Sequence, residues 1–263
     1  MHFSDVMQTL RRDGDLWSAE VPEDWMQGRS VFGGLQAALA VAAMRALAPA
    51  GVPLRTLQAS FLAPVPGGRV QLRAARMREG KSASFVEARI VDGAQTLCTA
   101  VGVFGSARPS VVAVTPPPRA VAADKPIEFR YLPGVTPAFT QFFPSRWLRG
   151  GLPFTGTPLP EAVIEVNMTD RAAAAASEAH LIAIADFLPP IALSMLAKPA
   201  AGSTMTWMLE FLADRYDQWG LAGWRVDADL VAARDGYTSQ SVLVRAPDGT
   251  PAALSRQSMV VFG

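Results

Sequence analysis

Residues 68–93 read GRVQLRAARMREGKSASFVEARIVDG, and residues 224–249 read WRVDADLVAARDGYTSQSVLVRAPDG. Identical residues recur in the same order at a constant offset of 156, and in the first copy they are Arg69, Val70, Arg78, Gly80, Val86, Arg89, Asp92 and Gly93. Agreement in both order and spacing predicts that the chain is a tandem duplication of one folding unit.

The repetition extends beyond this pattern, because FLA at 61–63 returns as FLA at 211–213. Between the two copies lies SARPSVVAVTPPPRAVAADK, which has proline clusters and no sustained hydrophobic periodicity, as is typical of a linker. We therefore expect an N-terminal repeat at residues 1–105, a proline-rich linker at 106–125 and a C-terminal repeat at 126–263.

Each half contains a long apolar stretch, GGLQAALAVAAMRAL at 33–47 and HLIAIADFLPPIALSML at 180–196. Their length and alanine and leucine content favour helices, and Pro189 and Pro190 mark a start or a break in the second. Runs rich in valine, phenylalanine and threonine follow each stretch, joined by Asp-Gly turns typical of β-hairpins. Strands grouped after a helix predict an α+β fold with a largely antiparallel sheet.

Composition excludes several classes of protein. Half of the 263 residues are hydrophobic and the formal net charge is +1, so neither disorder nor binding to a polyanion is indicated. Cys98 is the only cysteine, and His2 and His180 are the only histidines, which gives poor support for a disulfide, a Ser-His-Asp triad or a metal site. We expect a cytoplasmic protein with no signal peptide, membrane span, nucleic-acid partner, metal or cofactor.

Polar residues that occur in only one copy are candidates for chemistry. Asp186 interrupts the apolar stretch IAIADFLPP, and aligning the two predicted helix starts places it opposite SVFGG, which has no acid. An aspartate before a proline-containing first turn also suits an N-cap, and both roles can hold. Thr204 and Thr206 lie two apart on a predicted strand and are expected to face the same side. Gln257 needs partners if it is buried, although a lone strand glutamine is more often exposed.

The order of these segments resembles the medium-chain acyl-CoA thioesterase II family. The first half carries FGG before a helix, then SFLAPV, REGKSASF, an Asp-Gly turn and VFG; the second carries ADFLPPIAL, STMTWMLEF and SRQSMVVFG. The resemblance runs from about Asp15 to Gly263. It implies a double hot-dog fold, in which two tandem copies of a long helix are wrapped by antiparallel sheet, and hydrolysis of an acyl-CoA to fatty acid and CoA.

The resemblance also implies that the C-terminal repeat carries the catalytic residues. Matched motif by motif, these are Asp186, Thr204 and Gln257, with Asp186 accepting a proton from a water that the other two position. The family often has aspartate where this chain has Thr206, so the choice between the two threonine hydroxyls stays open.

Substrate binding is expected at the start of the first predicted helix. Phe32, Gly33 and Gly34 lie there, and the bare N–H groups of a helix start can bind the oxyanion that forms when a thioester is attacked. Thr206 is also expected to contact the substrate. The substrate is expected to be a small-molecule acyl-CoA. Hot-dog units generally bury a sheet edge or face against a partner, so a homodimer or higher homo-oligomer is also expected.

Two other functions stay open from the sequence. A hot-dog hydratase or dehydratase acting on acyl-CoA would use a histidine with an acid, and His180 is poor material for that role. A non-catalytic acyl-CoA-binding protein would keep the scaffold alone, and the joint presence of Asp186 and Gln257 argues against it.

Overall fold

The computed structural model describes residues 1–121 and 125–262. Residues 122–124 of the expected linker, and Gly263 at the end of the expected C-terminal repeat, lie outside the described residues. The helical segments are α1 (Phe3–Met7), η1 (Glu23–Trp25), α2 (Gly33–Arg45), η2 (Ala138–Phe142), α3 (Glu178–Ala185) and α4 (Ala192–Met195). None of the described helices is both long and apolar enough to cross a membrane.

Both halves contribute strands to one antiparallel sheet. The first half supplies β1 (Arg11–Asp13), β2 (Leu16–Val21), β5 (Leu54–Phe61), β6 (Gly68–Glu79), β7 (Ala83–Asp92) and β8 (Gln95–Gly105). The second supplies β9 (Ile127–Phe129), β10 (Ser145–Arg149), β11 (Glu161–Val166), β12 (Ala201–Phe211), β13 (Trp224–Arg234), β14 (Tyr237–Arg245) and β15 (Pro251–Phe262). A separate ribbon pairs β3 (Met26–Gln27) with β4 (Ser30–Val31).

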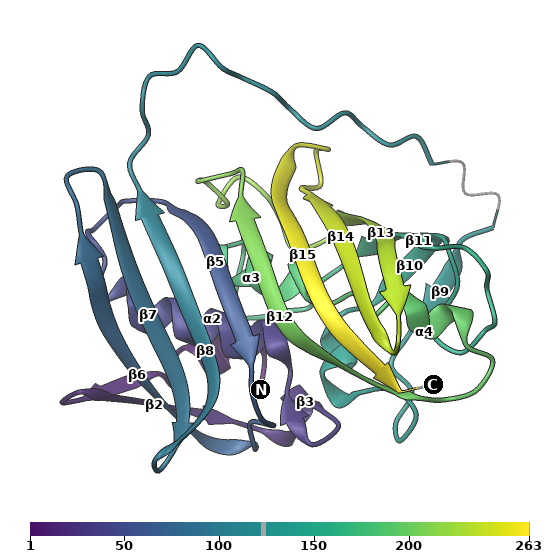
Figure 1. Cartoon of the computed structure of the whole chain (residues 1–263), viewed down its shortest axis with the longest axis horizontal. Coiled ribbons are helices and arrows are strands. Elements are labelled where there is room, and N and C mark those ends of the chain that lie inside the picture. Colours follow the sequence, from purple (N-terminus) through teal and green to yellow (C-terminus); the bar gives the residue numbers. More distant parts are fainter. Residues whose placement is uncertain (122–124, 263) are drawn as a thin grey trace.

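The strand order of the 13-stranded sheet is symmetric about the β5–β12 pair, except for the extra strand β9 at one edge: β1-β2-β6-β7-β8-β5-β12-β15-β14-β13-β11-β10-β9. Strands that correspond in the sequence repeat, such as β8 and β15, lie at equal distances from the β5–β12 pair. These two strands are antiparallel neighbours with Leu57 opposite Leu209, and they join the two halves side by side (Figure 1). The repeat is thus built as a pseudo-two-fold arrangement whose axis passes between β5 and β12.

The hot-dog expectation needs one correction. We expected two tandem copies of a long helix wrapped by antiparallel sheet, but one continuous sheet serves both halves, and of the described helices only α2, with 13 residues, is long. In the second stretch α3 ends at Ala185, and the four-residue α4 follows after the two prolines. Pro189 and Pro190 have no backbone N–H to donate to the preceding turn, so they cannot continue α3.

The predicted hairpin turns are confirmed. Asp92 is the last residue of β7 and Gly93 begins the turn to β8, and Asp235-Gly236 connects β13 to β14. Asp235 and Gly236 have φ values of 54° and 79°, the positive values that a type I′ turn requires at both central residues. The described part of the linker, 106–121, contains no helix or strand and runs along one end of the sheet (Figure 1).

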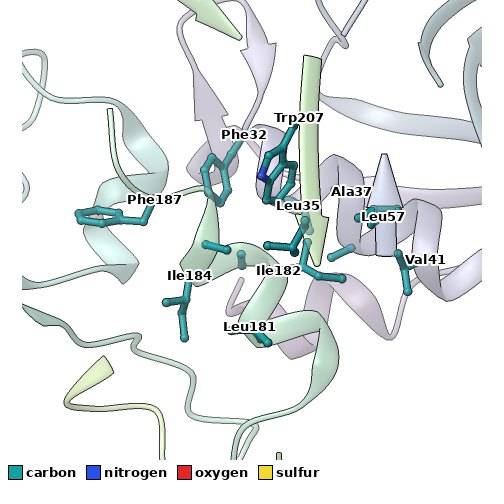
Figure 2. Packing of buried hydrophobic residues seen from close by; sticks show 14 of the residues in the cluster. Phe32, Leu35, Ala37, Val41, Leu57, Leu181, Ile182, Ile184, Phe187 and Trp207 are labelled. Atoms are coloured by element: carbon teal, nitrogen blue, oxygen red, sulfur yellow. The ribbon is translucent and has the colours of Figure 1, made fainter. Parts of the chain in front are cut away.

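The core lies between the sheet and the α2–α3 pair. Both helices are apolar on nearly all sides and buried, as expected of helices enclosed by other elements. The two helices can approach closely because Gly34 has no side chain; a Cβ there would come within 3.0 Å of the Ala183 Cα. Figure 2 shows Leu35 and Ile182 packed together beside Trp207. Each such large apolar side chain contributes about 1.5–3 kcal/mol by burial.

Candidate active site

Asp186 lies where the C-terminal end of α3 meets the N-terminal end of α2. It is the C-cap of α3, so the expectation that it caps a helix N-terminus was wrong. The helix stops before the two prolines instead of starting at them. Because α2 and α3 pack antiparallel, this C-cap reaches the first turn of α2 from the other half of the chain.

Two donors hold the Asp186 carboxylate. Gln257 Nε2 donates to Asp186 Oδ1 at 2.7 Å, and the Gly34 backbone N–H donates to the same carboxylate. Gln257 is 1% exposed, so it is a buried residue with partners and not the exposed strand residue that its type alone favours. A Cβ at Gly33 would lie 2.7 Å from Asp186 Oδ2, which explains why the residue beside the carboxylate has no side chain.

The electrostatic setting of Asp186 is unusual for an aspartate. Burial raises the pKa of its carboxyl to about 7, against the opposing effect of the hydrogen bonds from Gly34 and Gln257. The C-terminal end of α3 also disfavours a negative charge there, whereas the N-terminal end of α2 favours it. Asp186 therefore changes charge near neutral pH.

Asp186 opens onto a pocket of about 240 Å³. The pocket is lined by Gln27, Ser30, Val31, Gly33, Gln36, Phe61, Leu62, Ala63, Pro64, Asp186, Pro190, Gly202, Ser203 and Thr204. Both halves of the chain contribute to it, and Asp186 is the one ionisable side chain among these residues. Within 1–121 and 125–262, no three histidine, cysteine, aspartate or glutamate side chains are grouped to hold a metal ion.

The two candidate threonines point to opposite faces of the sheet, so the expectation that they share a face was wrong. A β-bulge at Met205 interrupts the alternation, since Thr204 pairs with Met259 and Thr206 pairs with Ser258. Met259 lies on the buried face together with Gln257, whereas Thr206 is exposed on the other face. Thr204 lines the Asp186 pocket and Thr206 does not.

The other predicted binding residues are divided between the pocket and the core. Gly33 lines the pocket. Gly34 contacts Asp186 through its backbone N–H. Phe32 has no exposed surface and stacks on Phe139 at a ring-centroid distance of 4.0 Å, and it is not part of the pocket lining.

One buried polar residue near the site was missed from the sequence. Gln240 on β14 is 1% exposed and donates through Nε2 to Gln257 Oε1 at 3.0 Å. A signal was present, because Gln240 alternates in phase with Val242 and Val244, and period-two spacing places all three on the buried face of a strand.

His180, the histidine considered for a dehydratase, lies away from the pocket lining. It is in the first turn of α3, and its Nε2 lies 3.1 Å from Asp170 Oδ2 while its Nδ1 lies 2.7 Å from Ser177 Oγ. Asp170 also accepts a hydrogen bond from the Ser4 N–H, which ties α1 to this position. Burial lowers the pKa of His180 and so favours the neutral ring, consistent with a structural contact.

Comparison with known proteins adds information at the level of family and fold. The family model "Acyl-CoA thioesterase N-terminal domain" matches residues 21–105, and "Acyl-CoA thioesterase C-terminal domain" matches residues 114–261. No curated protein sequence matches the chain.

Solved structures share the fold along the whole chain. A conserved hot-dog protein of unknown function from Alicyclobacillus acidocaldarius is 24% identical, with a TM-score of 0.84 over 99% of this chain and 98% of the other. The tesB protein of Mycobacterium avium subspecies paratuberculosis is 15% identical, with a TM-score of 0.77 over 100% of both chains. The dehydratase domain of RzxB from Pseudomonas fluorescens is 13% identical, with a TM-score of 0.61 over 100% of both chains.

At these identities the structures establish the hot-dog fold alone, which thioesterases and dehydratases share. The two family models together span most of the chain, including the segments that hold Asp186, Thr204 and Gln257. The chain belongs to the acyl-CoA thioesterase family.

Proposed function

We propose that the chain hydrolyses acyl-CoA thioesters in the Asp186 pocket, with Asp186 as general base. The observation that carries this proposal is a carboxylate held by two donors, with a pKa of about 7, as the one ionisable group of its pocket. A base works best when its pKa lies near the working pH, because it is then deprotonated and still basic enough to accept a proton.

The proposed reaction starts with a water beside Asp186 and Thr204. As the water oxygen attacks the thioester carbonyl carbon, Asp186 takes one of its protons and a tetrahedral oxyanion forms. The C–S bond then breaks, the carbonyl re-forms, and the departing CoA thiolate takes the proton from Asp186. The products are a fatty acid and CoA, and the carboxylate is restored.

Thr204 and Gln257 are proposed to orient that water. Thr204 lines the pocket and can both accept and donate a hydrogen bond through its hydroxyl. Gln257 donates to Asp186 through Nε2 and accepts from Gln240 through Oε1. It is buried and does not line the pocket, so it is proposed to orient the water through Asp186.

The start of α2 is proposed to stabilise the oxyanion. Gly33 lines the pocket at the first position of the helix, where backbone N–H groups have no partner within the helix and the helix dipole is positive. One such donor is worth roughly 3 kcal/mol of transition-state stabilisation. The apolar lining, with Val31 and Phe61, is proposed to hold the start of the acyl chain.

A thiol-release assay over a series of acyl-CoA chain lengths tests this proposal. The reagent has little background, because burial raises the pKa of Cys98, the only cysteine, to about 12. We expect release from the wild-type chain to rise with pH around a midpoint near 7, and Asp186→Asn to lose it by about 10²–10⁴-fold while remaining folded. Near-normal release by a folded Asp186→Asn variant would contradict the assignment.

Following the conversion of crotonyl-CoA beside thiol release separates the other two functions. A hydratase would convert crotonyl-CoA without releasing thiol, and a binding protein would retain acyl-CoA without turnover of either kind. The RzxB dehydratase domain shares the fold, but His180 does not line this pocket, so the thioesterase is the function that the site favours.

A further inference from the structure

Gln240 connects the backbone beyond the prolines to the catalytic carboxylate. Its Oε1 accepts a hydrogen bond from the Ile191 N–H at 3.1 Å, and its Nε2 donates to Gln257 Oε1 at 3.0 Å. Gln257 Nε2 donates in turn to Asp186 Oδ1 at 2.7 Å. The three hydrogen bonds all run in one direction, from the backbone toward Asp186.

The Ile191 N–H, the first donor of this chain of hydrogen bonds, fixes their direction. A backbone N–H can only donate, so the amide oxygen of Gln240 has to face Ile191, which leaves its nitrogen facing Gln257. The oxygen of Gln257 then faces Gln240, and its nitrogen faces the carboxylate. If Gln257 turned over, its oxygen would face the carboxylate of Asp186, and two acceptors would repel each other.

We propose that Gln240 is a positioning residue, which holds the amide of Gln257 in the orientation that donates to Asp186. This inference rests on the proposed role of Asp186 in hydrolysis. Gln240 itself is buried at 1% exposure and does not line the pocket, so it acts through Gln257 and not on the substrate.

The first test is Gln240→Leu, which removes both hydrogen bonds at a similar side-chain size. We expect kcat to fall by about 10- to 100-fold, because the amide next to the base loses its fixed orientation. KM should stay within about 2-fold, since the substrate does not contact this residue. The pKa of Asp186 should rise, because the hydrogen bond from Gln257 lowers it in the intact chain.

A matched control removes another buried hydrogen bond from the same face of the sheet, on the neighbouring strand β15. Ser255 on β15 lies two residues from Gln257, and its Oγ accepts from Trp207 Nε1 at 2.8 Å. Ser255→Ala should reduce stability without changing kcat or the pKa of Asp186. A general loss of core packing would affect both variants alike.

Gln240→Glu provides a conservative rescue. A protonated glutamic acid can accept from Ile191 through its carbonyl and donate to Gln257 through its hydroxyl, and burial favours that protonated form. We expect activity within about 5-fold of wild type near pH 7. At higher pH the ionised side chain cannot donate, so a falling limb should appear that the wild type lacks. Thermal melting at each pH separates this limb from unfolding.

The closing experiment has one readout that does not need turnover. The carboxyl ¹³C signal of Asp186, assigned with Asp186→Asn, reports its pKa in the wild type and in Gln240→Leu. In parallel, kcat is compared for Gln240→Leu, Gln257→Leu and the double variant. If Gln240 acts through Gln257, it adds less than about 2-fold to the loss in the Gln257→Leu background.

The outcomes are distinct. A wild-type chain that releases no thiol from any acyl-CoA removes the proposed function, while the ¹³C titration still tests the role of Gln240. A folded Gln240→Leu variant with an unchanged pKa of Asp186 overturns the inference. So does a double variant in which the two losses multiply in full.

Discussion

The two ends of the α2–α3 pair carry pockets of similar size with opposite electrostatics. One end holds the Asp186 pocket. The other end holds a pocket of about 300 Å³, here called the Arg45 pocket, lined by Arg45, Gly51, Val52, Pro53, Glu178, Asp214 and Tyr216. The offset of 150 that relates FLA at 61–63 to FLA at 211–213 also relates Pro64 of the first pocket to Asp214 of the second.

In the Arg45 pocket the helix ends are electrostatically satisfied. Glu178 is the first residue of α3 and Arg45 is the last residue of α2, so an acid lies at a helix N-terminus and a base at a C-terminus. They form a two-point ion pair, in which Arg45 Nε donates to Glu178 Oε2 at 2.9 Å. Arg45 also donates to the Val52 carbonyl.

At the Asp186 pocket the helix ends have no such pairing, because the acid lies at a helix C-terminus and the helix N-terminus carries no charged side chain. The first residue of α2 is Gly33, and the acid is Asp186 at the C-terminal end of α3. None of the described residues that line this pocket is a cation, and burial raises the pKa of the Asp186 carboxyl to about 7. One end of the helix pair thus has a paired acid and base, whereas the other keeps a buried carboxyl that lowers stability when it is charged.

The two pockets should differ most in their effect on activity. Asp186→Asn and Glu178→Gln each remove one carboxylate from the start or end of α3, with almost no change in size. We expect the first to reduce kcat by about 10³-fold and the second to leave it within about 2-fold. The thiol-release assay at pH 8 measures both. Equal losses in the two variants would mean that hydrolysis does not belong to one pocket.

A smaller effect is expected from the two glycines that begin α2. A methyl group at Gly33 would meet Asp186 Oδ2 at 2.7 Å, whereas one at Gly34 would meet the Ala183 Cα at 3.0 Å and the Phe32 ring at 2.7 Å. Gly33→Ala should therefore move the carboxylate and lower kcat by about 10- to 100-fold. Gly34→Ala should mainly separate the helices and lower stability by about 1–3 kcal/mol. The pattern is wrong if Gly33→Ala keeps full kcat in a folded protein.

The smallest expected effect is on the free energy of unfolding. At pH 8, removing the charge of Asp186 should raise it, and removing the charge of Arg45 should lower it. The folded pKa of Asp186, about 7, lies above the ordinary aspartate value near 4. Its contribution to stability is therefore fully present below pH 4 and is lost as pH rises through 7. Asp186→Asn avoids that loss, so at pH 8 it should be more stable than wild type by roughly 1–3 kcal/mol, and at pH 4 it should not.

Arg45→Met is the counterpart in that measurement. It leaves Glu178 partly buried without its partner, and we expect a loss of about 1–3 kcal/mol at pH 8. Urea unfolding of both variants at pH 4 and pH 8 gives the two signs. A destabilised Asp186→Asn variant at pH 8 would show that the carboxylate is held more favourably than its burial implies.

The sequence predicted the parts of this fold that depend on local pattern and repetition. The hairpin turns, the antiparallel sheet and the start of α2 at Gly33 follow from Asp-Gly pairs, alternation and helix-forming residues. It did not predict that β5 and β12 pair into one sheet, because the identity of an edge partner depends on tertiary docking and not on a local period.

The sequence pointed to Asp186 and Gln257 but not to how they are arranged. Asp186 and Gln257 are joined by a hydrogen bond across 71 positions of sequence. The bulge at Met205, which separates Thr204 from Thr206, leaves no mark in the residue pattern, since a bulge is one extra residue in a ladder. The alternation of residues along its strand places Gln240 on the buried face. A buried polar residue needs a hydrogen-bond partner, but the sequence does not show which residue that is.

The pairing of β5 with β12 holds the two halves of the chain together without help from a strand of the linker. Asp186 is held by Gly34 from one half and by Gln257 from the other, so a working site requires both halves docked. The described linker residues, 106–121, add no strand to that junction. They contact the second half through the Arg119–Asp229 ion pair and a hydrogen bond from Arg245 to the Pro117 carbonyl. By connecting the two halves they also keep each at a high effective concentration near the other. Two separately made halves should therefore complement each other, and the loss of activity on dilution would measure the affinity of one half for the other.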